Sequence, residues 1–149
     1  MFHSLADCIS AQLEMLRLAG IPDRIGAARF GIAAGEVCSA VEHYRGPVEG
    51  DFPALVVVSL TAVPIEELVR SVDLGGKKGF TCINALLEST SDSLGPLSII
   101  FGVDLGDEEV REWPSIYGKL LASRNRRPLT PAAAVAAALY SPEALKRHP

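Results

Sequence analysis

The stretch Ala54-Leu55-Val56-Val57-Val58-Ser59-Leu60 decides the fold. It is short, apolar and rich in β-branched residues, which favours a buried strand over a helix. The segment Leu97-Ser98-Ile99-Ile100-Phe101-Gly102-Val103 has the same character and predicts a second strand. Helical spacing surrounds both stretches, so the sequence predicts an α+β protein.

The residues between the two strands predict two helices separated by a glycine-rich loop. Pro64 suits a first helical turn, and apolar residues then recur at helical spacing as far as Val72. The loop Gly75–Gly79 follows, and residues 80–87 again show helical spacing. This order of strand, helix, loop, helix and strand predicts a small βααβ core.

The N-terminal third predicts three helices. The first carries an apolar stripe, contains Gln12 as its one polar member and ends at Gly20. A short helix over residues 25–30 stops at Gly31, and a third runs from about residue 33 to residue 44. The stripe of the first helix consists of Leu5, Ile9, Leu13 and Leu16.

The C-terminal third predicts a helical extension. Acidic residues from Asp107 begin one helix, and a basic linker follows at residues 124–128. Thr130 and Pro131 then provide a cap and a first-turn proline for an alanine-rich helix that ends near Tyr140. We therefore divide the chain into a helical unit (1–46), a small α/β core (47–106) and a helical extension (107–149), within one compact domain.

Composition excludes several classes of protein. The chain has 149 residues, of which 48% are hydrophobic and 21% charged, so it can bury a core without metals or disulfides. Its three cysteines are odd in number and form no C-x-x-C pair, which favours a reducing compartment. No secretory signal or membrane-length apolar run is present. We expect a cytoplasmic protein without a membrane partner, and no pattern predicts a catalytic residue, a metal site or a cofactor.

Charge is distributed unevenly along the chain. The formal net charge is −4, but residues 51–110 hold 3 basic and 10 acidic side chains, whereas residues 111–149 hold 7 and 2. An asymmetric chain of this kind can present a basic surface to a polyanion. The alternative is that the acidic middle and the basic tail neutralise each other, within one fold or between subunits.

Residues 22–45 resemble the helix-turn-helix of repressor and Cro-type DNA-binding proteins. Ala27 takes the place of the small residue in the first helix, and Gly31 that of the turn glycine. The resemblance implies that Arg29 and Arg45 contact the DNA backbone. No side chain suited to reading base edges lies in the second helix, so a helical packing unit is the alternative. The apolar residues that would seal the two helices are Phe30, Ile32, Val37 and Val41.

Residues 54–103 carry a second resemblance. Gly76-Lys77-Lys78-Gly79 is a G-x-x-G loop, and its position between two predicted helices is similar to the KH module. With Phe80-Thr81, the loop also resembles that of the CRM domain, an RNA-binding domain of ribosome-assembly proteins. Both resemblances imply phosphate contacts from Lys77 and Lys78. The alternative is a glycine-rich helix end with exposed lysines. Neither resemblance covers the whole chain.

Two functional hypotheses follow. The first is a non-enzymatic nucleic-acid-binding or regulatory protein that contacts DNA or RNA. The second is a protein-interaction or self-assembling accessory module, in which the alanine-rich helix docks on a partner or a sister subunit. An enzyme is a third possibility, because a site assembled from distant residues leaves no local trace. Under the first hypothesis, the contacting residues are Arg29, Arg45, Lys77, Lys78, Arg124, Arg126 and Arg127.

Overall fold

A two-stranded antiparallel sheet lies at the centre of the molecule. The computed structural model describes residues 4–79, 95–105, 119, 121–126, 128–143 and 146. Within these residues the main sheet pairs β1 (Phe52–Val58) with β4 (Leu97–Val103). The register runs from Phe52 opposite Val103 to Val58 opposite Leu97. The predicted α+β class is confirmed, and β4 has the predicted bounds.

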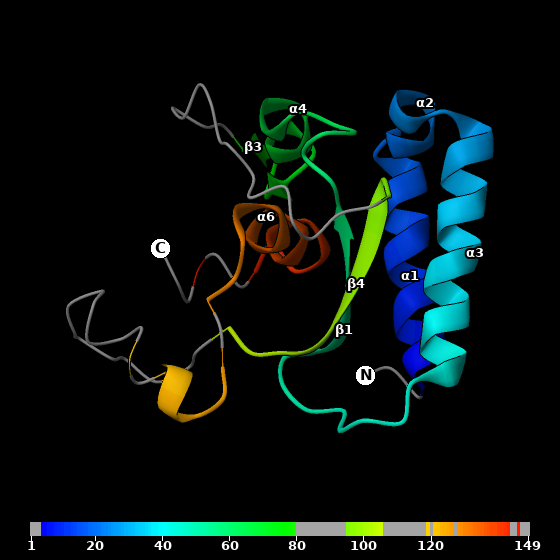
Figure 1. The fold of residues 1–149 in the computed structure, drawn as a ribbon. Helices are drawn as coiled ribbons and strands as arrows, with labels where there is room; N and C mark the ends of the chain where they lie inside the picture. The colour runs from blue at the N-terminus through cyan, green and yellow to red at the C-terminus, as the bar shows by residue number, and fades with distance from the viewer. Residues whose placement is uncertain are drawn as a thin grey trace.

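Helices cover both faces of this sheet. Figure 1 shows α1 and α3 on one side of the sheet, and α6 on the other side with α4 beside it. Apolar side chains from the N-terminal, central and C-terminal parts of the chain meet in one core cluster. The remaining elements have these bounds: α1 Leu5–Leu18, α2 Ile21–Ile25, α3 Ala27–His43, α4 Ile65–Arg70, β2 Asp73–Leu74, β3 Lys77–Lys78 and α6 Pro131–Tyr140.

The predicted helix-turn-helix is wrong, because α3 continues through Gly31 as a single helix. The chain instead turns at Gly26, whose φ of 102° lies in the region that favours glycine. The short helix precedes this turn as α2, and does not occupy residues 25–30. Ile32, which would seal the helix pair, is 66% exposed, whereas Phe30 is buried. Residues 22–45 thus contain most of the short helix α2, the turn at Gly26 and the single long helix α3.

The predicted glycine-rich loop over Gly75–Gly79 is also wrong, because these residues belong to a strand hairpin. After α4 the chain enters a small antiparallel hairpin, in which Asp73 pairs with Lys78 and Leu74 with Lys77. Gly75 and Gly76 form its turn with φ values of 61° and 83°. A two-residue turn with positive φ at both positions is the turn that hairpins prefer. Both lysines therefore lie on β3, and the predicted helix over residues 80–87 lies outside the described residues.

The alanine-rich helix begins as predicted but has a different role. Thr130 caps α6 by accepting a hydrogen bond from the Ala133 N–H (3.2 Å), and Pro131 occupies the first turn. The prediction that this helix docks on a partner is wrong for its alanine face, because that face packs on β1 within the chain. Alanine lets a helix approach a sheet closely, so low apolar volume does not exclude a core role. The buried alanines are Ala132, Ala133, Ala136 and Ala137. The helix predicted from Asp107 begins outside the described residues.

The outer edge of β1 is closed by side chains from both helical layers. The Ser59 N–H donates to the Pro96 carbonyl at 2.9 Å, so residues 55, 57 and 59 direct their backbone N–H and carbonyl groups toward β4 and its N-terminal flank. Residues 54, 56 and 58 therefore direct theirs away from β4. Gln12 of α1 donates to the Ala54 carbonyl and accepts from the Val56 N–H, both at 2.8 Å. The Tyr140 hydroxyl of α6 donates to the Val56 carbonyl at 2.8 Å. Burial raises the pKa of this hydroxyl well above its ordinary value, so it remains a neutral donor.

Replacing Gly31 with alanine distinguishes a continuous helix from a turn. A Cβ at Gly31 meets no atom within 4 Å, and alanine favours a helix interior over glycine by about 1 kcal/mol. Gly31→Ala is therefore expected to raise the free energy of unfolding by about 0.5–1 kcal/mol in urea titrations. Gly26→Ala is the matched control and is expected to lower it by about 1–2 kcal/mol, because its φ is positive. Destabilisation by Gly31→Ala would contradict the continuous helix.

Replacing Gln12 with leucine tests the closure of β1. The change leaves the buried Val56 N–H without a partner and the Ala54 carbonyl with only the weak Cys8 thiol donor, at a cost of about 1–3 kcal/mol for each group. We expect Gln12→Leu to lower the free energy of unfolding by about 2–4 kcal/mol, measured by urea denaturation. Glu14→Leu on the exposed side of the same helix should change it by no more than about 0.5 kcal/mol. Equal effects of the two substitutions would argue against this role of Gln12.

Candidate functional site

Arg29 and Arg45 lie at different places on the long helix. Arg29 is an exposed residue in the first half of α3, and no described residue forms an ion pair with it. Arg45 follows the C-terminal end of the helix, where its Nη1 donates to the carbonyls of Glu42 (2.7 Å) and Tyr44 (3.0 Å). Basic side chains commonly satisfy the last carbonyls of a helix in this way. Arg45 therefore has a local structural role.

The two lysines of the G-x-x-G sequence are exposed on β3, and one of them is paired. The Lys78 Nζ lies 2.7 Å from a carboxylate oxygen of Asp73, whose other oxygen accepts the Gly76 N–H at 2.8 Å. These two partners hold the pKa of Asp73 below its ordinary value. Lys77 forms no ion pair with a described residue.

The last glycine of the G-x-x-G sequence is required by packing. A Cβ at Gly79 would overlap the Val69 carbonyl oxygen of α4, so only glycine permits this approach. The Gly79 N–H also donates to the Val72 carbonyl at 3.0 Å. The glycine spacing is therefore explained by a hairpin turn and by its attachment to the preceding helix.

Arg126 completes the main sheet at a point where the ladder lacks a donor. The register places Pro53 opposite Gly102, and proline has no N–H to donate. The Arg126 Nη1 donates to the Gly102 carbonyl at 3.0 Å. Arg124 is exposed, and Arg127 lies outside the described residues. Arg126 thus contributes to strand pairing at the end of β4.

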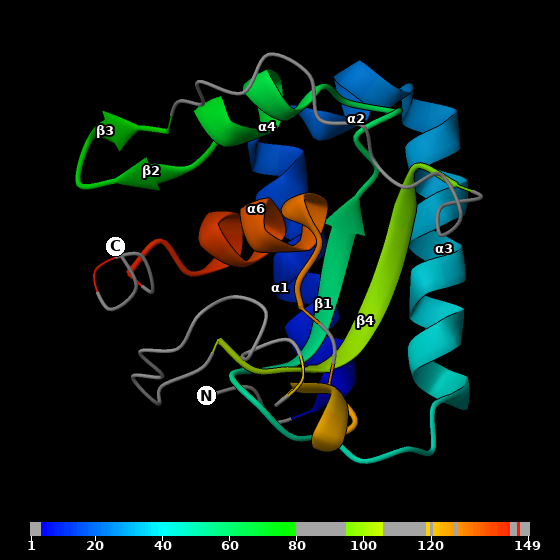
Figure 2. The same ribbon diagram turned by 60° about the vertical axis from the view of Figure 1, so that its left-hand side comes forward.

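The predicted cationic residues do not gather on one described surface. Figures 1 and 2 both show β3 near α4 at one end of the molecule, and the helical turn at residues 121–123 at the opposite end. A polyanion site needs several cations within reach of neighbouring phosphates. The hairpin lysines and the basic linker therefore do not form a joint phosphate-binding surface.

The outer edge of β4 carries a row of backbone groups for which the described part of the chain supplies no partner. In an antiparallel pair, alternate residues of a strand hydrogen-bond to the neighbouring strand, and on β4 and its flank these are residues 96, 98 and 100. The N–H and carbonyl groups of residues 97, 99, 101 and 103 therefore point away from β1. No described residue hydrogen-bonds to the outward groups of Leu97, Ile99 or Phe101. Unpaired groups on a strand edge are a template for pairing with another chain.

The two edges of the sheet also differ in their side chains. On β1, Ala54, Val56 and Val58 are buried. On β4, Ile99 and Phe101 are half-buried, whereas Leu97 at the start of the strand is buried. Strand β4 contains no charged residue and no proline, the two devices that commonly protect an edge. Sequence reasoning identified the strand but missed its open edge. The signal in the sequence that could have indicated this edge is the lack of charged residues and proline in β4.

The open edge has a defined length. At its far end, Gly50 lies so close to the Val103 carbonyl oxygen that a Cβ there would overlap it. The Tyr44 ring stacks on the Phe101 ring, with 3.7 Å between centroids and 3° between planes. The Tyr44 hydroxyl donates to the Pro47 carbonyl at 2.8 Å, which fixes the ring. The row of outward backbone groups without a described partner therefore extends from Leu97 to Phe101.

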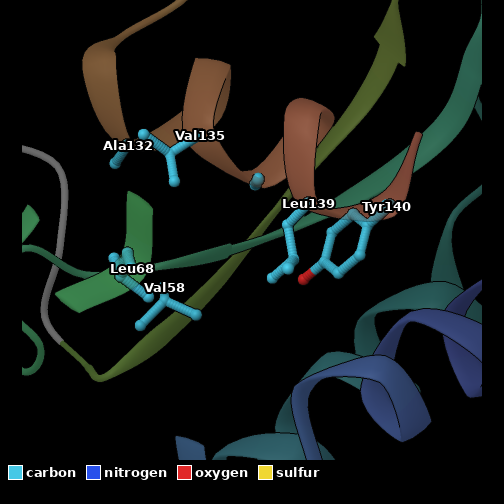
Figure 3. A pocket seen from close by; sticks show the side chains of 7 residues that line it. Val58, Leu68, Ala132, Val135, Leu139 and Tyr140 are labelled. Carbon is cyan, nitrogen blue, oxygen red and sulfur yellow. The ribbon is translucent and has the colours of Figure 1, made fainter. Parts of the chain in front are cut away.

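A small apolar cavity lies between α6, α4 and β1. It has room for about one water molecule and is partly open to solvent. Figure 3 shows apolar side chains lining it, with Leu139 and Tyr140 at one side and Leu68 and Val58 at another. Its polar atom, the Tyr140 hydroxyl oxygen, is hydrogen-bonded to the Val56 carbonyl. No charged side chain lines the cavity, so it offers no group for acid–base or nucleophilic chemistry.

The cysteines and acidic residues of the described segments do not form a reactive centre. Cys8 is buried, and burial raises the pKa of its thiol, which disfavours the reactive thiolate. Cys38 is exposed on α3, and Cys82 lies outside the described residues. In the part of the chain that the structure describes, no three His, Cys, Asp or Glu residues cluster as metal ligands. None of its helices is both long and apolar enough to cross a bilayer.

No protein-family model, no curated protein sequence and no solved structure matches this chain.

Proposed function

We propose that this chain is a protein-interaction module that binds its partner by accepting an additional strand on the outer edge of β4. One observation carries the proposal: Gln12 and Tyr140 close the β1 edge, whereas no described residue hydrogen-bonds to the outward backbone groups of Leu97, Ile99 and Phe101 on β4. A partner strand would supply the missing hydrogen bonds. This is the β-augmentation mode of peptide recognition, in which main-chain hydrogen bonds provide affinity and side-chain contacts provide specificity.

The size of the sheet supports the same conclusion. Two strands are marginal as an independent sheet and depend on packing against helices. Here the helices stabilise β1 on both faces and at its edge, through α1 and α6. Strand β4 receives α3 on one face and leaves its edge without a described partner. An added strand would extend the sheet without disturbing any described hydrogen bond.

Nucleic-acid binding remains the second candidate, because Arg29 and Lys77 are exposed and form no ion pair with a described residue. Seven cationic contacts to B-DNA would give a slope of about −6 for log K against log salt, whereas two give about −2. Arg45, Lys78 and Arg126 have partners within the chain, which favours the smaller slope.

The salt dependence of nucleic-acid binding separates the two candidates. We expect mixed-sequence DNA and RNA to bind weakly at low ionic strength, with a slope no steeper than about −2 in anisotropy titrations. Lys77→Ala and Arg29→Ala together should then remove most of the binding. A slope near −6 that becomes shallower by about one unit with each of Lys78→Ala, Arg124→Ala and Arg127→Ala would favour the nucleic-acid hypothesis instead.

Selection of peptides against the chain tests strand addition directly. We expect displayed random peptides that bind the chain to be rich in β-branched residues, and to bind Ile99→Pro at least tenfold more weakly. Proline at position 99 removes an outward N–H and leaves the ladder residues 98 and 100 in place. Ile99→Val is the matched control and should bind normally, because it retains that N–H.

Two further results decide the test of strand addition. Urea denaturation should show a cooperative unfolding transition for Ile99→Pro before its binding is compared. If the proline variant does not fold, amide exchange of the unmodified chain with a selected peptide replaces it, and slower exchange at Leu97, Ile99 and Phe101 is expected. Peptides that bind Ile99→Pro as tightly as the unmodified chain would contradict strand addition at this edge.

A further inference from the structure

We infer that the occupant of the β4 edge is a single extended segment of a different protein, and not the β4 strand of a second copy of this chain. The inference rests on the proposed function and specifies its partner. It is carried by the position of α3 relative to β4.

Helix α3 lies over β4 and packs on it closely. Figures 1 and 2 show the helix running beside this strand, on the side of the sheet away from α6. Buried residues of α3 share a core cluster with Ile99 and Phe101. Tyr44, directly after the helix, stacks on Phe101. The helix therefore remains over the strand when the edge is occupied.

Symmetric pairing of two β4 strands would bring two α3 helices together. An antiparallel pair related by a two-fold axis keeps both helices on the same face of the joined sheet. Paired strands lie about 4.8 Å apart, whereas packed helix axes need about 8–10 Å. Each α3 lies over its own β4, so the two helices would overlap before the strands could pair.

A single extended segment meets no such obstacle, because it carries no helix over its own face. It would lie beside Leu97, Ile99 and Phe101, a length of about five residues. Side chains of the segment that point to the α3 side would adjoin the apolar side chains of these three residues, which belong to the α1–α3 core cluster. Those on the other side would adjoin Ser98 and Ile100. The partner segment is thus uncharged at the alternate positions that point toward α3, because a charge there would lose its hydration.

The sequence of strand β1 provides a peptide probe. Strand β1 already pairs with β4, and its side chains alternate between the same two faces of the sheet. Its residues 54, 56 and 58 lie in the α1–α3 cluster, and residues 55 and 57 lie in the α6 cluster. A peptide of residues 54–58 between pairs of lysines therefore suits the outer edge as well. The control is the same peptide with proline at its central position, which cannot complete the ladder.

The experiment combines light scattering with amide exchange of the full chain measured by NMR. We expect a monomer over a hundredfold range of concentration. The β1 peptide is expected to slow exchange at Leu97, Ile99 and Phe101 at least tenfold, with no change at Ser98 and Ile100. The proline-containing peptide should leave all five amides unchanged.

The other outcomes distinguish the two proposals. A dimer in which Leu97, Ile99 and Phe101 become protected as the concentration rises would overturn this inference and leave strand addition in place. A dimer in which these three amides stay unprotected would use another surface. In that case both proposals hold if the β1 peptide still slows exchange at the three amides, and both fail if it does not. If neither the β1 peptide nor any selected peptide slows exchange at these three amides, both proposals are overturned.

Discussion

The rest of the structure depends on the two hydrogen bonds between the Gln12 side chain and the outer edge of β1. The amide of Gln12 donates to the Ala54 carbonyl and accepts from the Val56 N–H, as a neighbouring strand would. A polar side chain inside an apolar helix stripe is costly unless it is fully hydrogen-bonded. These bonds fix α1 beside β1 and supply the groups that a third strand would otherwise provide. The Tyr140 hydroxyl continues this closure from the opposite layer.

The closed outer edge of β1 contrasts with the outer edge of β4. Helices cover the sheet on both sides, and both faces of β1 are buried. The outward backbone groups of Ala54 and Val56 are hydrogen-bonded to side chains. Strand β4 has the same ladder but no comparable side chain at its outer groups among the described residues. This difference between the two edges is the one that the proposed strand addition on β4 requires.

Several of the glycines and cations that resembled nucleic-acid motifs have structural explanations. Gly75 and Gly76 form a hairpin turn, and Gly79 permits a close contact with α4. Arg126 replaces the donor that Pro53 lacks, and Arg45 satisfies the end of α3. A short motif specifies a local backbone requirement, and several different folds share that requirement. Only the positions of neighbouring elements distinguish a phosphate loop from a hairpin.

The sequence by itself determined the features that depend on near neighbours in the chain. These were strand β4, the apolar stripe of α1, and the Thr130–Pro131 start of α6, because periodicity and capping act within a few residues. Tertiary structure alone decided the continuity of α3 through Gly31 and the burial of the α6 alanines. It also gave Gln12 its partners, which lie 42 and 44 residues away along the chain. A backbone edge is closed or open only after distant elements have packed, so local patterns carry no record of it.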